Sequence, residues 1–212
     1  MKRLDRTAVP APPCLSKYVA GRDNWSQVSP EHKEQIRAYL KALQGERCAY
    51  CEADISLSGS HVEHFCPKGH PKYRHLTFEW SNLYWSCDEK DSCGHHKDHG
   101  AGPYSPEDLI QPCVHDPDRY LRFRSDGTVA PRRGLSADDE RRARETLRVF
   151  NLAGCARLRN MRRAVAAGYV TEADDLSLFA PEERRELARE TLEKTAGLPF
   201  STLIRHIFED VS

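Results

Sequence analysis

The sequence predicts an α+β fold that is mainly helical, with a compact central block embedded between an N-terminal helix and a C-terminal helical region. Apolar residues recur at helical spacing in residues 30–44 and again from residue 137 onward. Cysteine and histidine crowd into the middle, since residues 48–115 contain six of the eight cysteines and eight of the ten histidines. Packing alone does not explain such crowding.

The first half of the chain divides into an arm and a helix that leads into the central block. Residues 1–28 are rich in proline and in polar and charged residues, so we expect an extended N-terminal arm. Ser29 is a suitable N-cap for the helix that follows, and Gly45 is a suitable residue to end it. Residues 29–115 are therefore expected to hold the N-terminal helix together with the central block.

The second half is a connecting segment followed by helices. Residues 116–135 are rich in proline and glycine, and a short strand pair joined by an Asp-Gly turn can form a hairpin there. Residues 136–212 are expected to be a helical region. One of its helices should cover residues 155–167 and stop before Gly168.

Composition and the length of apolar runs indicate the cellular compartment to expect. Its 39% hydrophobic and 30% charged residues are ordinary for a globular chain, and the formal net charge is zero. No apolar run approaches the roughly 20 residues of a membrane span, and the first residues contain no apolar signal segment, so we expect the cytoplasm and no membrane. Because the cytoplasm is reducing, the cysteines should serve metal binding rather than disulfides.

Two cysteine pairs bracket the central block and could supply four thiolates: Cys48 with Cys51, and Cys87 with Cys93. Four soft thiolates suit a closed tetrahedral zinc site, and structural zinc contributes on the order of 10 kcal/mol to folding. The second pair is spaced more widely than usual. One ligand could therefore be replaced by Cys66, His61 or Cys113.

An acid-histidine strand lies between the two pairs. Strand alternation places Glu63 and His64 on opposite faces. Glu63 could then help to hold a divalent cation on a phosphate, while His64 removes a proton from water. Phosphodiester hydrolysis needs both functions. The alternative is that both are polar residues on a solvated strand. Lys97 could contact a phosphate, although a lone lysine on a helix is more often a solvated charge.

Four segments of the central block resemble the HNH nuclease family: CAYCE, VEHFCPK, FEWSNLYWSC and CGHHKD. The resemblance implies a small zinc-stapled ββα-metal core, two strands and a helix around one catalytic divalent cation, which could be Mg²⁺, Mn²⁺ or Zn²⁺. More narrowly, these segments resemble the HNH proteins of retron and Septu-type anti-phage systems. Those proteins work beside an ABC-type ATPase, so the resemblance implies such a partner.

The resemblance also implies residue roles. His64 matches the general base, Glu63 the metal ligand on the strand, and Asn82 the residue that orients the base. His95 is the expected second ligand, at the start of the last helix. In the family a ligand more commonly follows the cysteine directly, where this chain has a glycine. The ligand therefore remains open among His95, His96, Asp98 and His99.

An arginine-rich stretch in the last third could hold nucleic acid. Residues 132–163 contain ten arginines against four acidic residues. On two helices this excess could form a surface that tracks phosphates. Arginine is also a common solvated helix residue, and an acidic protein partner would use the same surface. No segment is typical of an element that reads base sequence.

The sequence thus predicts a metal-dependent HNH endonuclease that hydrolyses phosphodiester bonds, with DNA as the expected substrate. It would be the effector of an anti-phage defence complex with an ATPase partner. The alternative is a noncatalytic zinc-binding module for nucleic acid or protein interaction. A redox role of the first cysteine pair is disfavoured because no thioredoxin-like βαβ pattern surrounds it. The oligomeric state stays open.

Overall fold

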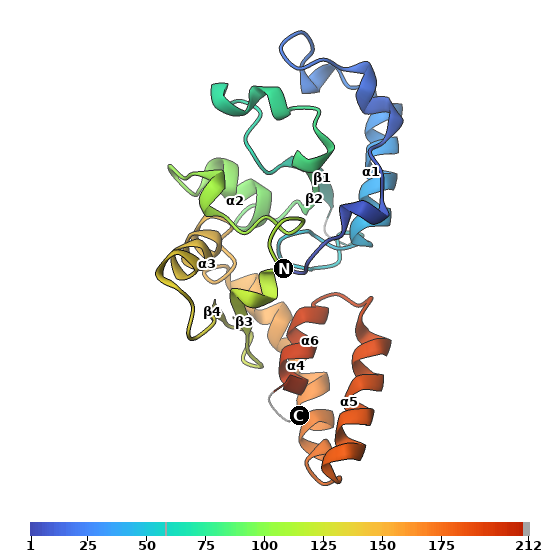
Figure 1. Cartoon of the computed structure of the whole chain (residues 1–212), viewed down its shortest axis with the longest axis vertical. Helices are drawn as coiled ribbons and strands as arrows, with labels where there is room; N and C mark the ends of the chain where they lie inside the picture. Colours follow the sequence, from blue (N-terminus) through green and yellow to red (C-terminus); the bar gives the residue numbers. More distant parts are fainter. Residues whose placement is uncertain (58, 210–212) are drawn as a thin grey trace.

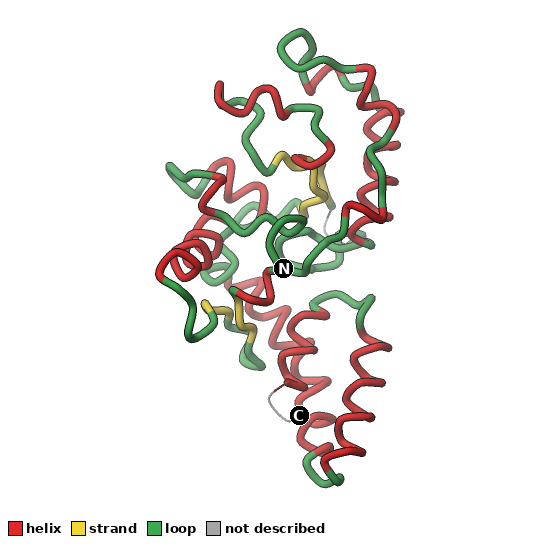
Figure 2. Tube along the Cα trace, viewed as in Figure 1, coloured by secondary structure: helices red, strands yellow, loops and turns green. Residues whose placement is uncertain are grey.

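The structure is a computed structural model that describes residues 1–57 and 59–209 (Figures 1 and 2). About half of the described residues are helical, and two small antiparallel sheets accompany the helices. The α+β prediction is confirmed. The molecule is elongated, with the central block and the N-terminal helix at one end and a group of helices at the other (Figure 1).

Helix α1 (Pro30–Gln44) follows the predicted boundaries. The Ser29 side chain accepts a hydrogen bond from the His32 backbone N–H, and the helix ends at Gly45, whose φ is 68°. The first 28 residues run along this helix (Figure 1) and contain three short 3₁₀ helices at Arg6–Ala8, Pro13–Lys17 and Trp25–Gln27. The arm packs onto the molecule through a small apolar cluster shared with α1.

The central block consists of two strands and a helix in that order. Strand β1 (Ser60–His64) is antiparallel to β2 (Leu83–Cys87), with Ser60 opposite Cys87 and His64 opposite Leu83. Helix α2 (Cys93–His99) packs against β2. Two 3₁₀ helices, Pro71–Leu76 and Trp80–Asn82, lie in the connection between the strands.

Residues beyond the central block form a hairpin and four helices. Strands β3 (Leu121–Phe123) and β4 (Val129–Pro131) make the predicted antiparallel hairpin. The helices are α3 (Ala137–Val149), α4 (Ala156–Leu176), α5 (Pro181–Thr195) and α6 (Ser201–Glu209). Two further 3₁₀ helices precede them, at Pro106–Asp108 and Pro117–Arg119.

Helix α4 corrects one predicted boundary. The expected stop before Gly168 is wrong, because the helix continues through this residue to Leu176. A glycine inside a helix costs about 1 kcal/mol relative to alanine. Ala166, Ala173 and Leu176 are buried on both sides of it, and this packing holds the helix together.

One large apolar core joins the central block to the C-terminal helices. Tyr50 of the central block stacks on Phe150, which follows α3, with 4.1 Å between ring centroids. Phe65 and residues of α4 and α6 belong to the same buried cluster. The block is therefore supported by the helical region. Among the described helices, none is both long enough and apolar enough to cross a membrane.

Candidate metal centre and active site

Four buried cysteines converge at the base of the central block: Cys48, Cys51, Cys87 and Cys93. Their sulfur atoms all lie within 4.8 Å of one another. The first two precede β1, the third ends β2 and the fourth begins α2, so the cluster ties these segments together. Four thiolates in this arrangement suit a structural metal ion such as zinc. Cys66, Cys113 and His61 are not members of the cluster.

A buried arginine accompanies the cysteines. Arg162 belongs to the arginine-rich stretch of residues 132–163, yet it is fully buried and donates to the Leu152 carbonyl at 2.8 Å. Its guanidinium lies over the Phe123 ring at 5.2 Å. Burial lowers the pKa of Arg162, while the thiols of Cys51 and Cys93 favour its charged form. Its positive charge would therefore partly balance the negative charge of the four thiolates when they hold a metal ion.

Glu63 and His64 face different parts of the molecule, as strand alternation predicts. The carboxylate of Glu63 lies 2.8 Å from Lys97 Nζ on α2. His64 faces the other way, towards Trp25 of the arm and the Thr77 carbonyl. Both Glu63 and His64 are only 3% exposed, so neither is a solvated strand residue.

The ion pair of Glu63 and Lys97 is an interior contact. Burial alone would raise the pKa of Glu63, but Lys97 and then His61 lower it. Burial would also lower the pKa of Lys97, but the Glu63 and Asp98 carboxylates raise it. The interpretation of Lys97 as a solvated residue or a direct phosphate contact is therefore wrong, because its side chain is enclosed between β1 and α2.

His64 is held as a neutral imidazole. Burial, followed by the positive charge of Lys68, lowers its pKa to about 4. Its Nε2 lies 3.0 Å from the Thr77 carbonyl, which can only accept, so Nε2 carries the proton and Nδ1 keeps a lone pair. Nδ1 is buried and has no hydrogen-bond partner in the described part of the chain. The ring can therefore accept a proton at Nδ1.

Asn82 binds two backbone segments that follow His64, at Cys66 and at Leu76, and makes no hydrogen bond with the His64 ring among the described residues. Its amide oxygen accepts from the Cys66 N–H at 2.7 Å, and its amide nitrogen donates to the carbonyls of Cys66 at 3.0 Å and Leu76 at 3.1 Å. Leu76 directly precedes Thr77, whose carbonyl binds His64. Asn82 thus joins the end of β1 to the segment that sets the tautomer of His64.

His95 joins a second group of metal-binding side chains, with His61 and Asp88. One donor atom from each of the three lies within 4.8 Å of the others. Glu63 is outside this group, although its Oε2 lies 3.5 Å from His61 Nε2. Sequence reasoning missed Asp88. The available signal was an acid directly after a cysteine at the end of a predicted strand.

The other three candidates for the helix ligand have different surroundings. His96 Nδ1 lies 2.9 Å from the Val149 carbonyl, facing α3. Asp98 pairs with Lys97. The His99 ring centroid lies 6.2 Å from that of His95.

Gly94 lies where the start of α2 passes close to the side chains of β1. A Cβ at this position would lie 2.9 Å from Glu63 Oε2 and 2.9 Å from His61 Nε2. Contacts that short do not occur, so a side chain here would push both groups away. The glycine lets the start of α2 approach β1 closely, and the first imidazole after it belongs to His95.

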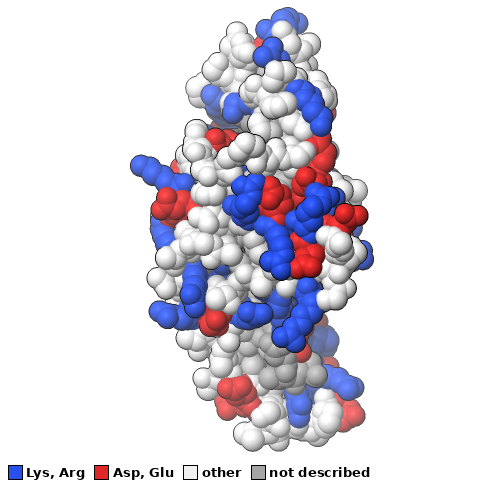
Figure 3. Space-filling model, turned by 90° about the vertical axis from the view of Figure 1, so that its left-hand side faces the viewer, with Lys and Arg blue, Asp and Glu red and all other residues white. Residues whose placement is uncertain are grey.

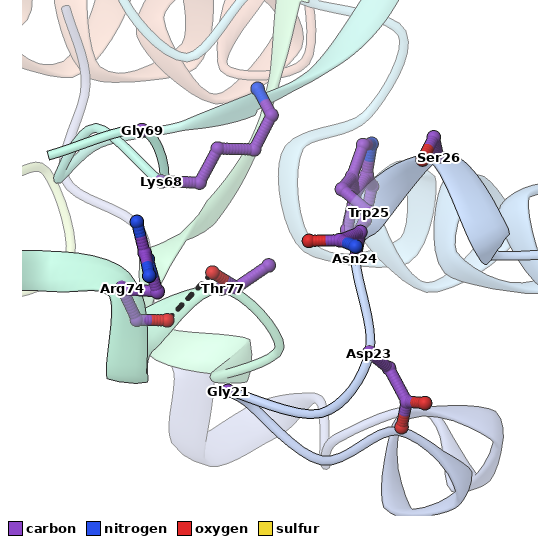
Figure 4. Close-up of a pocket in the computed structure, with 9 residues that line it drawn as sticks. All are labelled: Gly21, Asp23, Asn24, Trp25, Ser26, Lys68, Gly69, Arg74 and Thr77. Atoms are coloured by element: carbon purple, nitrogen blue, oxygen red, sulfur yellow. Dashed lines mark hydrogen bonds between the residues drawn. The ribbon is translucent and has the colours of Figure 1, made fainter. Parts of the chain in front are cut away.

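A cleft of about 580 Å³ adjoins His64 (Figure 4). One wall is the arm from Gly21 to Ser26, and the other carries Lys68, Arg74 and Thr77. Trp25 and Thr77 both line the cleft and both contact His64. The Trp25 ring stands perpendicular to the imidazole at 4.5 Å, between the cleft and the histidine.

Comparison with known proteins agrees with the motifs, although no known family model matches the chain. The chain is 28% identical over 126 residues to the Septu protein PtuB of Bacillus mycoides (strain KBAB4), across 48% of this chain and 42% of that protein. It is 31% identical over 103 residues to a protein of Vibrio cholerae serotype O1 biovar El Tor named "Retron Vc95 putative HNH endonuclease", across 47% of this chain and 48% of that protein. The chain is similar to Septu PtuB and to a retron HNH protein. It spans less than half the length of these relatives.

For a chain similar to an HNH nuclease, the arginine-rich stretch would be the obvious nucleic-acid surface. On α3, however, three of the four arginines pair with acids: Arg141 with Asp108, Arg144 with Glu140, and Arg148 with Glu145. Figure 3 shows the side of the molecule where α3 lies, and basic and acidic side chains alternate there. These three arginines therefore add little net positive charge to this face.

Proposed function

We propose that this chain is a metal-dependent HNH endonuclease that hydrolyses phosphodiester bonds, with DNA as the substrate. The observation that carries the proposal is the state of His64, a neutral imidazole with a free Nδ1 lone pair at the end of β1. His64 lies in the central block, which has the order strand, strand, helix and contains the four-cysteine cluster. The motifs and the printed name of the retron relative support the same activity.

The chemistry assigned to His64 is general base catalysis. Its Nδ1 accepts a proton from a water molecule, whose oxygen attacks the phosphorus while the bond to the leaving oxygen breaks. The Thr77 carbonyl keeps the proton on Nε2, and Asn82 holds the adjacent backbone. A divalent cation bound beside Glu63 and His95 would supply positive charge for the phosphate and the leaving oxygen. Trp25 must move from the imidazole before water reaches it.

The partner assignment rests on the relatives. Two of them are named as Septu proteins and a third as a retron protein. We propose that this chain likewise works as the effector of an anti-phage defence complex, beside an ABC-type ATPase. In that complex the ATPase would control when the nuclease cuts. The cluster of Cys48, Cys51, Cys87 and Cys93 would hold a structural zinc ion throughout.

The test of catalysis uses purified zinc-loaded protein with Mn²⁺ on plasmid DNA and on RNA. His64→Ala should lower the cleavage rate by about 10²–10⁴-fold, which is the range for loss of a general base. His70→Ala is the matched control, because His70 is an exposed histidine of the following loop. Equal cleavage by wild type and His64→Ala would exclude the role of this residue.

A noncatalytic zinc-binding module is the second candidate, and the burial of the two central residues favours it. His64 is covered by Trp25, and the charge of Glu63 is met by Lys97. In that case the chain would bind nucleic acid or a protein partner without cutting. Two results would support this function over the nuclease. The protein would retain one tightly held metal ion per chain and bind no exchangeable cation, and it would not cleave nucleic acid in the presence of the ATPase.

A further inference from the structure

Three side chains converge on the face of β1 opposite His64. Asp88 Oδ1 lies 2.7 Å from His61 Nδ1 and 3.7 Å from His95 Nε2. The imidazole centroids of His61 and His95 are 4.7 Å apart. Two histidines and one carboxylate therefore point at a common volume, and they come from β1, from the residue after β2 and from α2.

The cysteine cluster fixes the backbone from which two of the three project. Asp88 directly follows Cys87, and His95 is two residues after Cys93. His61 lies on the neighbouring strand, opposite Ser86 in the β1 and β2 register. A structural metal on the cysteines would therefore hold all three side chains in place without ligating them.

We propose that His61, Asp88 and His95 bind an exchangeable transition-metal ion, and that Glu63 is not one of its ligands. The identification of this ion as the catalytic cation rests on the proposed function, whereas its binding does not. Metal–ligand bonds of about 2 Å place two ligand atoms at most about 4 Å apart. The donor atoms of the three residues lie within 4.8 Å of one another, so small side-chain rotations close the site.

The donor set selects the metal. Imidazole nitrogens with one carboxylate suit Mn²⁺, Co²⁺ or Zn²⁺, whereas Mg²⁺ prefers oxygen ligands and retains its water. The side chains of His61, Asp88 and His95 are 31%, 42% and 36% exposed. Solvent can therefore reach the ion, and positions remain open for water or a phosphate oxygen. This accessibility distinguishes the site from the buried cysteine cluster.

Glu63 acts on this site through His61. Its Oε1 faces Lys97 and its Oε2 faces His61 Nε2 at 3.5 Å, so the carboxylate is enclosed between two positively polarised groups. A metal-binding histidine usually donates its second N–H to a carboxylate, which fixes the ring and raises its basicity. Glu63 is therefore a positioning residue that orients His61, while Nδ1 of His61 faces Asp88.

Metal binding can be measured without any nuclease assay. Zinc-loaded protein is titrated with Mn²⁺, and free Mn²⁺ is measured by electron paramagnetic resonance. One Mn²⁺ per chain should bind, and excess Mg²⁺ should not displace it. His61→Ala and Asp88→Asn should each weaken binding by at least about ten-fold, since loss of even an outer partner costs 10–100-fold. His99→Ala is the control and should bind as wild type does.

Asp88→Asn is the decisive variant, because it preserves shape and because a site made of Glu63 and His95 alone would not respond to it. Unchanged zinc content and circular dichroism establish that it folds. Wild-type Mn²⁺ affinity in Asp88→Asn and His61→Ala would overturn the proposal, as would equal loss in His99→Ala. A protein that binds Mn²⁺ through these residues but cuts nothing would keep the metal site and refute the nuclease.

Discussion

Lys97 Nζ on α2 lies 2.8 Å from Glu63 Oε1 on β1, and both side chains are buried. The pair joins the helix to the strand on the side of the sheet opposite His64. It sets the position of α2, and with it the position of His95. Removal of Lys97 would leave the buried Glu63 carboxylate with His61 alone, at 3.5 Å, and removal of Glu63 would leave Lys97 with Asp98.

Lys97→Met should lower the free energy of unfolding by about 3–5 kcal/mol, which is the usual effect of breaking a buried ion pair. The double variant Glu63→Gln with Lys97→Met should recover part of this loss, because no charge is then left alone. Urea unfolding measures both. Lys194→Met is the control, since Lys194 is exposed on α5 and its pair with Glu190 contributes little. A loss in Lys97→Met no larger than in the control would show that the pair does not hold α2.

Gly94→Ala should destabilise the protein by about 1–3 kcal/mol, as overpacking of a close contact does. The added methyl group would stand 2.9 Å from the Glu63 carboxylate, which cannot retreat because Lys97 holds it. Gly168→Ala is the matched control in α4, where, apart from its chain neighbours and the backbone of its own helix, no atom of the described residues lies within 4 Å of the new methyl group. It should stabilise by about 0.5–1 kcal/mol. Thermal unfolding of the two variants should therefore shift in opposite directions.

Removal of metal from the four-cysteine cluster should unfold the central block. Structural zinc contributes on the order of 10 kcal/mol, more than the total stability of many domains. Cys48→Ser should reduce bound zinc and lower the melting temperature, and a strong chelator should do the same to wild type. Cys66→Ser and Cys113→Ser should keep the full zinc content, since both residues lie outside the cluster. Zinc loss in either of these two would revive the alternative ligand sets.

Asp118 should make stability depend on acidic pH. Burial would raise its pKa, but hydrogen bonds with His206 and Arg205, both at 2.5 Å, lower it. A carboxyl group whose pKa is lower in the folded state than in the unfolded state stabilises the fold above about pH 4. This stabilisation is lost as pH falls further and the carboxylate is protonated. Asp118→Asn should therefore be less stable than wild type at pH 7, and the difference between the two should narrow progressively as pH falls below about 4. Asp138→Asn, at an exposed site, should follow wild type throughout urea unfolding at each pH.

Much of the fold could be predicted because its signals are local. Ser29 and Gly45 bound α1 as expected, and the alternation of Glu63 and His64 follows from strand geometry alone. The four cysteines could be predicted because two close pairs of soft ligands have few other uses in a reducing compartment. Gly168 does not end the helix, since its local cost is outweighed by the burial of Ala166, Ala173 and Leu176 on the same helix.

Contacts between distant segments could not be predicted. The choice among His95, His96, Asp98 and His99 depends on the rotation of α2 against β2 and α3, which turns His96 towards the Val149 carbonyl. Asp88 gains its role only when the β1 and β2 register brings His61 beside it. The arginine-rich stretch has an excess of basic residues, yet Arg162 is in the core and Arg141 pairs with Asp108 from an earlier segment of the chain.

The sequence by itself determined the helices, the acid-histidine strand and the four-cysteine cluster, because caps, periodicity and ligand spacing act between near neighbours. The tertiary structure alone decided that Glu63 pairs with Lys97, that Trp25 covers His64, and that His95 meets His61 and Asp88. The physical reason is that burial and Coulombic partners depend on how separate segments dock. The order of residue types along the sequence does not show directly how these segments pack against one another.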